Sequence, residues 1–413
     1  MILGSDSNPD NSSILAIRPP GIGKEALGYL VHALWRGPHR RNYSNKTYKP
    51  PMTNIRHRFS LSLDQDKLNQ FIMKFVADLG ASMHGPSILI GEQLGLYKAL
   101  AGASSPLTPK ELADRTGTAE RYVREWLAGQ ASSGYVNYDA STSKFTMSPE
   151  QAFALTNENN PLYIPGAFYI VGSAYRDQRK VADAYRSGKG LGWHEHHNDL
   201  FVGTQKFFKP GYIANLVGSW LPSLADVVEK LQKGARVADV GCGYGSSTII
   251  MAKAFPNSKF IGYDYHLESI EAARNISYGE NATANTDFEV ATAKDYPGKD
   301  FDLVTFFDCL HDMGDPMGAA RHVFESLKPD GTWMIVEPNA KESVSENLNP
   351  IGRVFYNASS MICVPSSLAQ EVGLGLGAQA SESDLRKVIE GGGFTRIRKA
   401  AETPFNRVFE ARR

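Results

Sequence analysis

The fold is decided by one stretch, Ala235-Arg-Val-Ala-Asp-Val-Gly-Cys-Gly-Tyr-Gly-Ser-Ser-Thr-Ile-Ile-Met-Ala-Lys-Ala254. Its first six residues are a short run with two β-branched valines, which predicts a strand that leads directly into the glycine turn. Residues 246–254 predict a helix, so the stretch reads as strand, glycine turn and helix. Glycine is required in the turn because a side chain there would fill the volume of a ligand or block helix–strand packing. The three glycines are Gly241, Gly243 and Gly245.

The next predicted strand, Lys259–Asp264, ends on an acid nineteen residues after Gly245. In sheets of this kind, an acid at that place accepts hydrogen bonds from the hydroxyls of a bound ribose. The two segments together therefore predict a nucleoside-containing ligand that lies against the glycine turn.

The glycine spacing indicates which nucleoside this is. Dinucleotide sites use Gly-x-Gly-x-x-Gly, whereas this chain has Asp239-x-Gly-x-Gly-x-Gly245, with an acid before the turn. That spacing resembles the class I S-adenosylmethionine-dependent methyltransferases. Their ligand carries an ammonium and a sulfonium, so a carboxylate at Asp239 suits it electrostatically. The resemblance implies S-adenosylmethionine as cofactor and S-adenosylhomocysteine as product.

The rest of the carboxyl-terminal half continues this resemblance. It implies an α/β, Rossmann-like sheet of seven strands, parallel except for an antiparallel carboxyl-terminal hairpin. After the first two strands, residues 288–295 resemble the third strand and the adenine-side loop, further strands are predicted at 301–308, 331–338, 394–399 and 406–411, and a helix at 316–327. The resemblance also implies cofactor contacts from Tyr265, Ala293 and Asp308. The acid that often contacts the adenine amine in this family is replaced by Thr292.

One histidine is the candidate catalytic residue. The segment Cys309-Leu-His-Asp-Met-Gly-Asp315 follows the predicted fourth strand. It resembles the Leu-His-Asp-Trp-x-Asp segment of plant and polyketide-type small-molecule O-methyltransferases, although Met313 replaces the tryptophan. The resemblance implies that His311 is the general base that deprotonates an acceptor hydroxyl, a role that suits an imidazole near neutral pH. The alternative is a structural histidine that caps the following turn.

Residues 66–150 are predicted to form a winged-helix domain. A capping box at Thr108 starts one helix, Thr118 caps a second, Gly134 ends it, and two short strands at 135–138 and 144–147 follow. We expect this domain to dimerise rather than to bind DNA, because its second helix presents charges of both signs. Those charges are Glu120, Arg121, Arg124 and Glu125.

Two further segments complete the predicted domain plan. Residues 151–225 are expected to be a helical linker that walls the pocket, and residues 226–413 the methyltransferase domain, with a substrate lid at 339–382. The histidine-rich stretch 193–197 does not have the spacing of a helical zinc site, so no metal is predicted. This plan resembles uncharacterised bacterial-type winged-helix methyltransferases.

Composition restricts the partners and the compartment. The chain has 413 residues with 44 basic and 44 acidic side chains, which does not favour nucleic acid as a partner, and no apolar run long enough for a membrane span. Its three scattered cysteines indicate a reducing compartment. Residues 1–62 are expected to be a disordered or targeting tail, since the first sixty hold nine basic and three acidic residues. We expect a cytoplasmic protein, or a mitochondrial one if residues 1–43 are a presequence.

The sequence thus predicts methyl transfer from S-adenosylmethionine to a small-molecule acceptor, at a hydroxyl oxygen, by a homodimer. Two alternatives keep the cofactor. One is a winged-helix regulator that senses S-adenosylmethionine and binds DNA, and the other is a homologue that binds the cofactor without transferring its methyl group. A nicotinamide-dependent oxidoreductase would need the dinucleotide spacing, which this chain lacks.

Overall fold

The computed structural model describes residues 63–413, so the predicted tail or presequence at residues 1–62 lies outside the described residues. Residues Asn69–Arg413 form one compact unit. No helix in the described part of the chain is long and apolar enough to cross a membrane.

The amino-terminal part of the unit is helical with a small β-hairpin, as expected for a winged helix. Its elements are α2 (Gln65–Gln93), α3 (Leu96–Ala101), α4 (Pro109–Thr116), α5 (Glu120–Ser132), β1 (Asn137–Asp139) and β2 (Lys144–Thr146). β1 and β2 pair antiparallel. Buried apolar side chains such as Leu112, Trp126 and Phe145 join the helices to the hairpin in one core.

Two helix caps are predicted in this domain, and the structure forms one of them. The capping box at the start of α4 is confirmed, since the Thr108 hydroxyl accepts from the Glu111 N–H and the Glu111 carboxylate accepts from the Thr108 N–H. The prediction that Thr118 caps α5 is wrong, because Ala119 is the residue at that cap and makes no side-chain bond. The Thr118 hydroxyl instead pairs with that of Thr116 at 2.8 Å.

A helical segment leads from the winged helix to the sheet. It contains α6 (Pro149–Thr156), α7 (Ala167–Ser187), the short turn η1 (Trp193–Glu195), α8 (Asp199–Asn215), and the turns η2 (Leu216–Trp220) and η3 (Leu221–Ser223). The Lys206 ammonium on α8 pairs with the half-buried Glu92 carboxylate on α2. Tyr163 and Tyr169 donate to the same carboxylate, so this ion pair fixes α8 to the winged helix.

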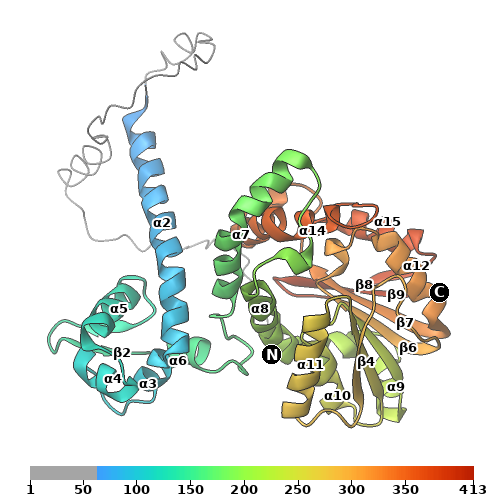
Figure 1. Cartoon of the computed structure of the whole chain (residues 1–413), viewed down its shortest axis with the longest axis horizontal. Coiled ribbons are helices and arrows are strands. Elements are labelled where there is room, and N and C mark those ends of the chain that lie inside the picture. The colour runs from blue at the N-terminus through green and yellow to red at the C-terminus, as the bar shows by residue number, and fades with distance from the viewer. Residues whose placement is uncertain (1–62) are drawn as a thin grey trace, which may run out of the picture. The chain divides into compact units, whose positions relative to one another are not determined.

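Seven strands form the predicted doubly wound sheet (Figure 1). They are β3 (Arg236–Val240), β4 (Lys259–Asp264), β5 (Thr286–Val290), β6 (Phe301–Phe307), β7 (Leu327–Pro338), β8 (Arg396–Glu402) and β9 (Asn406–Arg412). Their order is β5-β4-β3-β6-β7-β9-β8. The first five strands in this order are parallel, and β9 pairs antiparallel with both β7 and β8. The predicted fold class is therefore confirmed.

Helices cover both faces of the sheet, and its side chains alternate between two cores. One core holds Val240 and Ile335 with side chains of α12 (Pro316–Ser326) and α15 (Glu382–Gly391). The other holds Val237 and Met334 with side chains of α9 (Val227–Lys233) and α10 (Ser246–Ala254). α11 (Leu267–Gly279) packs against α10 through a smaller cluster that includes Phe288 of β5.

The segment that was expected to form a lid is largely helical. It holds η5 (Ser345–Asn347), α13 (Pro350–Ala358), the turn η6 (Ser359–Cys363) and α14 (Val364–Leu368). Ser367 of α14 donates to the carbonyl of Met313, just after the short turn η4 (Leu310–Asp312). This contact places α14 beside the carboxyl end of β6.

Candidate active site

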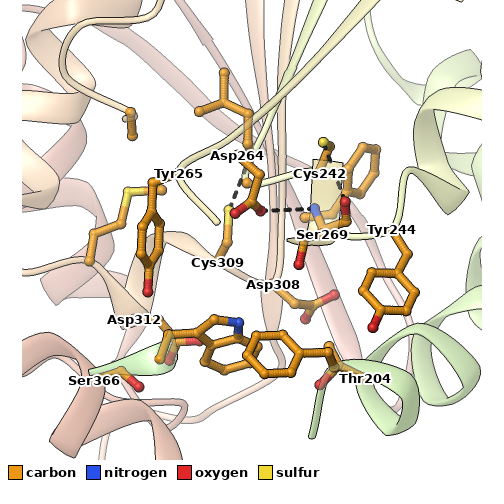
Figure 2. A pocket seen from close by; sticks show the side chains of 18 of the residues that line it. Thr204, Cys242, Tyr244, Asp264, Tyr265, Ser269, Asp308, Cys309, Asp312 and Ser366 are labelled. Atoms are coloured by element: carbon orange, nitrogen blue, oxygen red, sulfur yellow. Dashed lines mark hydrogen bonds between the residues drawn. The ribbon is translucent and has the colours of Figure 1, made fainter. Parts of the chain in front are cut away.

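A pocket of about 350 Å³ lies at the carboxyl edge of the sheet. Its wall includes the residues that directly follow β3, β4, β5 and β6, which is where an open α/β sheet binds its ligands. Figure 2 shows the carboxylates of Asp264, Asp308 and Asp312 among the side chains that line it.

The glycine turn after β3 forms one wall, and all three of its glycines have positive φ. A Cβ on Gly241 would lie 2.8 Å from the Cys309 sulfur, and one on Gly245 would lie 2.6 Å from the Phe288 ring. A side chain at either position would thus clash with the protein itself. This confirms the packing part of the steric argument for these two glycines, but not the part that concerns a ligand. A Cβ on Gly243 would meet no atom within 4 Å. Gly243 lines the pocket, so the space beside it is open.

Asp264 lies at the end of β4 and lines the pocket. The backbone N–H groups of Gly243 and His266 donate to its two carboxylate oxygens at 2.9 Å each. These bonds connect the acid to the glycine turn and fix its orientation, while each oxygen keeps a second lone pair for a ligand hydroxyl. Burial raises the pKa of Asp264.

Asp308 follows β6 in a left-handed conformation, with φ of +50°. Its Oδ1 accepts from the Asn406 amide at 2.8 Å, whereas its buried Oδ2 has no hydrogen-bond partner among the described residues. Burial, and then the nearby charge of Glu337, raises the pKa of Asp308 well above its usual value. A cationic donor in the pocket would satisfy Oδ2 and offset this desolvation.

Asp239, the acid before the glycine turn, does not line the pocket. It is 1% exposed, and its carboxylate accepts from the hydroxyls of Ser247, Thr248 and Thr305 at 2.6–3.0 Å. Burial raises its pKa to about 6. The structure therefore places Asp239 beneath the turn, where it ties β3 to the first turn of α10 and to β6.

The other predicted cofactor contacts, Tyr265 and Ala293, both line the pocket. Tyr265 follows Asp264 and packs edge-on against the ring of His194, with ring centroids 6.3 Å apart. Ala293 lies in the loop after β5 beside Thr292. The Thr292 hydroxyl donates to Asp295 at 2.6 Å.

His311 lies in η4 just behind the pocket wall, and it is 4% exposed. Its Nδ1 is 2.5 Å from the carboxylate of Glu337, at the end of β7. The Glu337 carboxylate also accepts from the Leu310 N–H at 3.0 Å, so η4 is held to β7 by one buried acid. The imidazole Nε2 lies 3.2 Å from the Oδ1 of Asp312, which does line the pocket.

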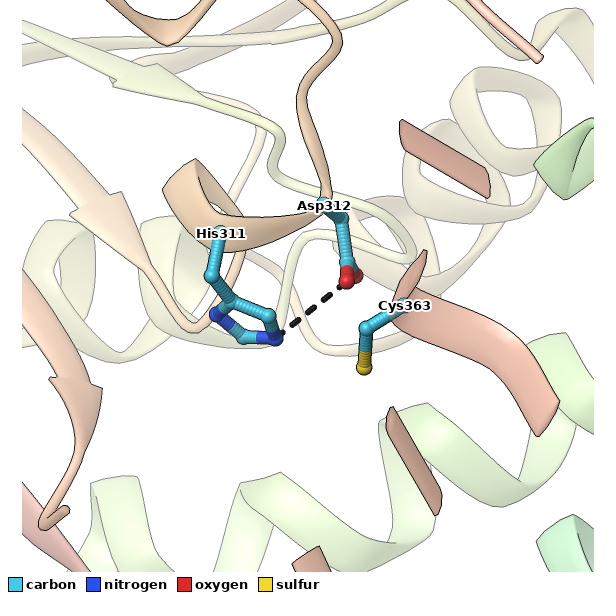
Figure 3. A group of neighbouring side chains, drawn as sticks. All are labelled: His311, Asp312 and Cys363. Atoms are coloured by element: carbon cyan, nitrogen blue, oxygen red, sulfur yellow. Dashed lines mark ion pairs between the residues drawn. The ribbon is translucent and has the colours of Figure 1, made fainter. Parts of the chain in front are cut away.

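The charge around His311 sets its protonation. Burial alone would lower the pKa of the imidazole, but the negative charges of Glu337 and Asp312 outweigh it and raise the pKa well above its usual value. Cys363 of η6 belongs to the same cluster (Figure 3). No sequence motif named above points to Glu337 or Cys363 as site residues. Glu337 could have been found, since it ends a strand next to β6.

Aromatic side chains from the helical segment form the opposite wall. Trp193 and His194 of η1 line the pocket, as do Phe201, Phe208 and Tyr212 of α8. Ser366, Ala369 and Gln370 add a wall from the segment 339–382. Neither Lys nor Arg occurs among the described residues that line the pocket.

Comparison with protein families identifies both parts of the chain. Residues 231–389 match the family model of a methyltransferase domain, and residues 85–157 match that of the Rv2258c-like winged HTH domain. The chain therefore contains an S-adenosylmethionine-dependent methyltransferase domain, preceded by a winged-helix domain.

Curated relatives are similar to about a third of this chain. Phosphoethanolamine N-methyltransferase 1 of Arabidopsis thaliana is 31% identical over 135 residues, which is 32% of this chain and 26% of the plant enzyme. Demethylmenaquinone methyltransferase of Lactobacillus johnsonii is 30% identical over 165 residues, 39% of this chain and 60% of that enzyme. The matched stretch thus spans about a quarter to three-fifths of these relatives.

Solved structures are similar over most of the methyltransferase chain. A putative O-methyltransferase from Nostoc punctiforme has a TM-score of 0.61 at 17% identity and covers 82% of this chain and 98% of its own. Human N-acetylserotonin methyltransferase in complex with SAM has a TM-score of 0.62 at 15% identity and covers 86% of this chain and 99% of its own. At these identities the likeness concerns the fold.

The pocket residues fit S-adenosylmethionine, the cofactor of the family. Asp264 offers lone pairs for ribose hydroxyls, and the buried Oδ2 of Asp308, unpartnered in the described part of the chain, suits the ammonium. Gly243 leaves open space where the backbone meets the pocket.

Proposed function

We propose that this chain transfers the methyl group of S-adenosylmethionine to a hydroxyl oxygen of a small molecule, with His311 as the general base. The observation that carries this proposal is the convergence, at one edge of the sheet, of the Asp264 and Asp308 carboxylates with the His311–Glu337 pair. A general base and a cofactor pocket within one site are what such a transfer needs.

Asp264, Gly243 and Asp308 would hold the cofactor, and Tyr265 and Ala293 would line its nucleoside. When bound, S-adenosylmethionine supplies a methyl group that its cationic sulfur has already activated. The protein therefore has two tasks, which are to position the acceptor oxygen and to take its proton. Positioning alone can account for much of the acceleration of such a displacement.

His311 is suited to take that proton. Once the pH is high enough for His311 to be neutral, Nδ1 donates to Glu337 and the lone pair lies on Nε2, on the side of Asp312 and Cys363. Asp312 lines the pocket and its Oδ1 lies 3.2 Å from Nε2. The route of the acceptor proton to His311 therefore begins at Asp312.

The pocket walls favour a neutral or cationic aromatic acceptor. Trp193, Phe201 and Phe208 contribute aromatic rings to the lining, whereas the acidic side chains Asp264, Asp308 and Asp312 line it without a Lys or Arg among the described residues. A phosphate group would find no cation there, so we do not extend to this chain the phosphoethanolamine in the names of several relatives.

The direct test incubates the purified protein with methyl-labelled S-adenosylmethionine and a cell extract, and identifies labelled metabolites by mass spectrometry. We expect a labelled methyl ether and S-adenosylhomocysteine in equal amounts. Calorimetry with S-adenosylhomocysteine runs in parallel. Tight binding without transfer to any metabolite would instead support a homologue that binds the cofactor without methylating.

We further propose that the chain is a homodimer through α2 and the winged helix. Four apolar side chains of α2 are 50–70% exposed, an apolar face that suits a second copy. They are Phe71, Phe75, Leu79 and Met83. The alternative partner, DNA, is less suited to α5, because its Arg121 and Arg124 are each paired with a glutamate of the same helix.

Light scattering tests this assembly. The wild type should run as a dimer at micromolar concentration, and the double variant Phe71→Glu/Met83→Glu as a monomer. Tyr278→Glu is the matched control, because it places the same charge on an aromatic side chain that is 79% exposed on α11, outside the winged helix. A monomeric wild type would contradict the proposal.

A further inference from the structure

Three potential metal ligands of different chemistry meet behind the pocket wall (Figure 3). They are the imidazole of His311, the carboxylate of Asp312 and the thiol of Cys363, whose ligand atoms all lie within 4.8 Å of one another. In the sequence, His311 and Asp312 are separated from Cys363 by about fifty residues, so the folded chain brings them together.

Nitrogen, sulfur and carboxylate oxygen together are a donor set of borderline-soft cations, with zinc as the most common one. Around a tetrahedral zinc ion, with bonds of about 2.0–2.3 Å, ligand atoms lie about 3–4 Å apart. The 3.2 Å between Nε2 of His311 and Oδ1 of Asp312 is in that range. A separation of up to 4.8 Å to the thiol needs a movement of about an ångström.

Glu337 supplies an independent observation that points to a ligand. A histidine that binds a metal through one ring nitrogen typically donates from the other to a carboxylate, which fixes its tautomer. His311 has this arrangement, since Nδ1 contacts the buried Glu337 carboxylate and Nε2 lies on the side of the cluster. In addition, the Asp312 carboxylate faces both of the other ligands, since its Oδ1 lies 3.2 Å from the His311 Nε2 and a carboxylate oxygen lies within 4.8 Å of the Cys363 thiol.

We propose that His311, Asp312 and Cys363 form a binding site for a zinc-class divalent cation. Asp312 lines the pocket, which gives the cation a path from solvent. Binding displaces the thiol proton of Cys363 to the buffer. Three protein ligands leave a fourth tetrahedral position for water or another donor.

The site has a consequence for catalysis that rests on the proposed function. A cation on Nε2 of His311 occupies the lone pair that the acceptor proton needs. Zinc therefore inhibits methyl transfer by blocking the general base, without competing for the Asp264 and Asp308 side of the pocket. Zinc and S-adenosylhomocysteine then bind together.

The test uses cobalt, a spectroscopic substitute for zinc, on the full-length protein. We expect one cobalt ion per chain, with a thiolate-to-cobalt charge-transfer band that zinc abolishes by displacement. The band should disappear in Cys363→Ser and persist in Cys242→Ser, a control thiol that lies in the glycine turn and is not part of the cluster. A band that survives in Cys363→Ser, or the absence of stoichiometric binding, would overturn the site.

Two further variants keep the test decisive if Cys363→Ser does not fold. Asp312→Asn should weaken zinc binding at least tenfold, and Glu337→Gln, which removes the carboxylate behind the imidazole, by about 10–100-fold. Unchanged affinity in both would overturn the site. If zinc binds at the cluster without loss of turnover, both the proposed inhibition by zinc and the proposed role of His311 as general base would be overturned. The cobalt spectra test the metal site independently of the proposed function.

Discussion

The wall that follows β3 and β4 is built from short runs of consecutive residues, whereas the wall around His311 is assembled from distant parts of the chain. In the first, Gly243 and Asp264 are joined by a backbone N–H bond, so the turn and the strand end define each other. In the second, Glu337 and Cys363 reach His311 from β7 and η6. One wall depends on backbone conformation and the other on a few buried side chains.

This difference predicts how each wall responds to substitution. On the wall that follows β3 and β4, which we call the cofactor wall, many contacts share the binding energy. Single side-chain changes there should reduce cofactor affinity moderately. On the wall around His311, which we call the acceptor wall, the imidazole of His311 carries the proposed proton transfer. Its loss should reduce turnover strongly and leave cofactor affinity unchanged. The following experiments test that separation.

The largest expected effect is that of His311→Ala. Removal of a general base typically lowers the rate by about 10²–10⁴-fold, so turnover should fall by that factor. The affinity for S-adenosylhomocysteine, measured by calorimetry, should change less than about threefold, because a general base contributes to proton transfer rather than to cofactor binding.

A loss of turnover below about threefold, far under the general-base range, would show that His311 is structural. The matched control is His322→Ala, a histidine of α12 that bonds to the Tyr296 carbonyl, away from the pocket lining. It should retain turnover.

The next effect concerns stability. Asp239→Ala leaves the hydroxyls of Ser247, Thr248 and Thr305, which are at most 3% exposed, without their shared acceptor. Each unsatisfied buried group costs about 1–3 kcal/mol, and the combined loss of unfolding free energy should be about 3 kcal/mol or more. Urea denaturation measures it, with the exposed Asp330→Ala as control.

If Asp239 instead contacted the ligand directly, the same variant would lose affinity for S-adenosylhomocysteine while unfolding at the wild-type urea concentration. That pattern would overturn the placement of Asp239 beneath the glycine turn.

The fold could be predicted from the sequence because its signals are local. The glycine spacing at 241–245, the strand ending at Asp264 and the capping box at Thr108 each lie within a few residues of what they determine. Thr118 is not the cap of α5 because Ala119 holds that position, and the Thr118 hydroxyl pairs with that of Thr116 instead. Propensity alone does not decide between two such partners.

The candidate site could be predicted less completely, for a physical reason. Whether a carboxylate faces a pocket depends on its partners. Asp239 is the last but one residue of β3, and Asp308 directly follows β6 of the same sheet. Three hydroxyls turn Asp239 inward, whereas Asn406, almost a hundred residues away, holds Asp308 at the pocket. No local pattern contains those partners.

A smaller effect is expected for Asp308→Asn. This change keeps the size of the side chain but removes the charge that would meet the cofactor ammonium. Since hydrogen bonds to charged groups contribute about 1.5–3 kcal/mol, affinity for S-adenosylhomocysteine should fall by about 10–150-fold. Asp330→Asn serves as the control. Equal affinity in calorimetry would remove Asp308 from the cofactor site.

The smallest effect at the optimum pH, and the sharpest test of the acceptor wall, is expected from Glu337→Gln. The general base accepts a proton only when it is neutral, so turnover should rise with pH as His311 loses its proton. The charges of Glu337 and Asp312 raise the pKa of His311, which places this rise above the pH expected for a free imidazole. Removing one of the two charges lowers that pKa.

The acidic limb of the kcat–pH profile should therefore move to lower pH in Glu337→Gln, by roughly 1–3 units, the range for one neighbouring opposite charge. The ratio of variant to wild-type turnover should therefore be higher at a pH below the wild-type limb than at high pH. Glu229→Gln, an exposed acid on α9, should leave the limb in place. An unmoved limb in Glu337→Gln would mean that the ionisation belongs to another group, such as the acceptor hydroxyl, and that Glu337 only orients η4.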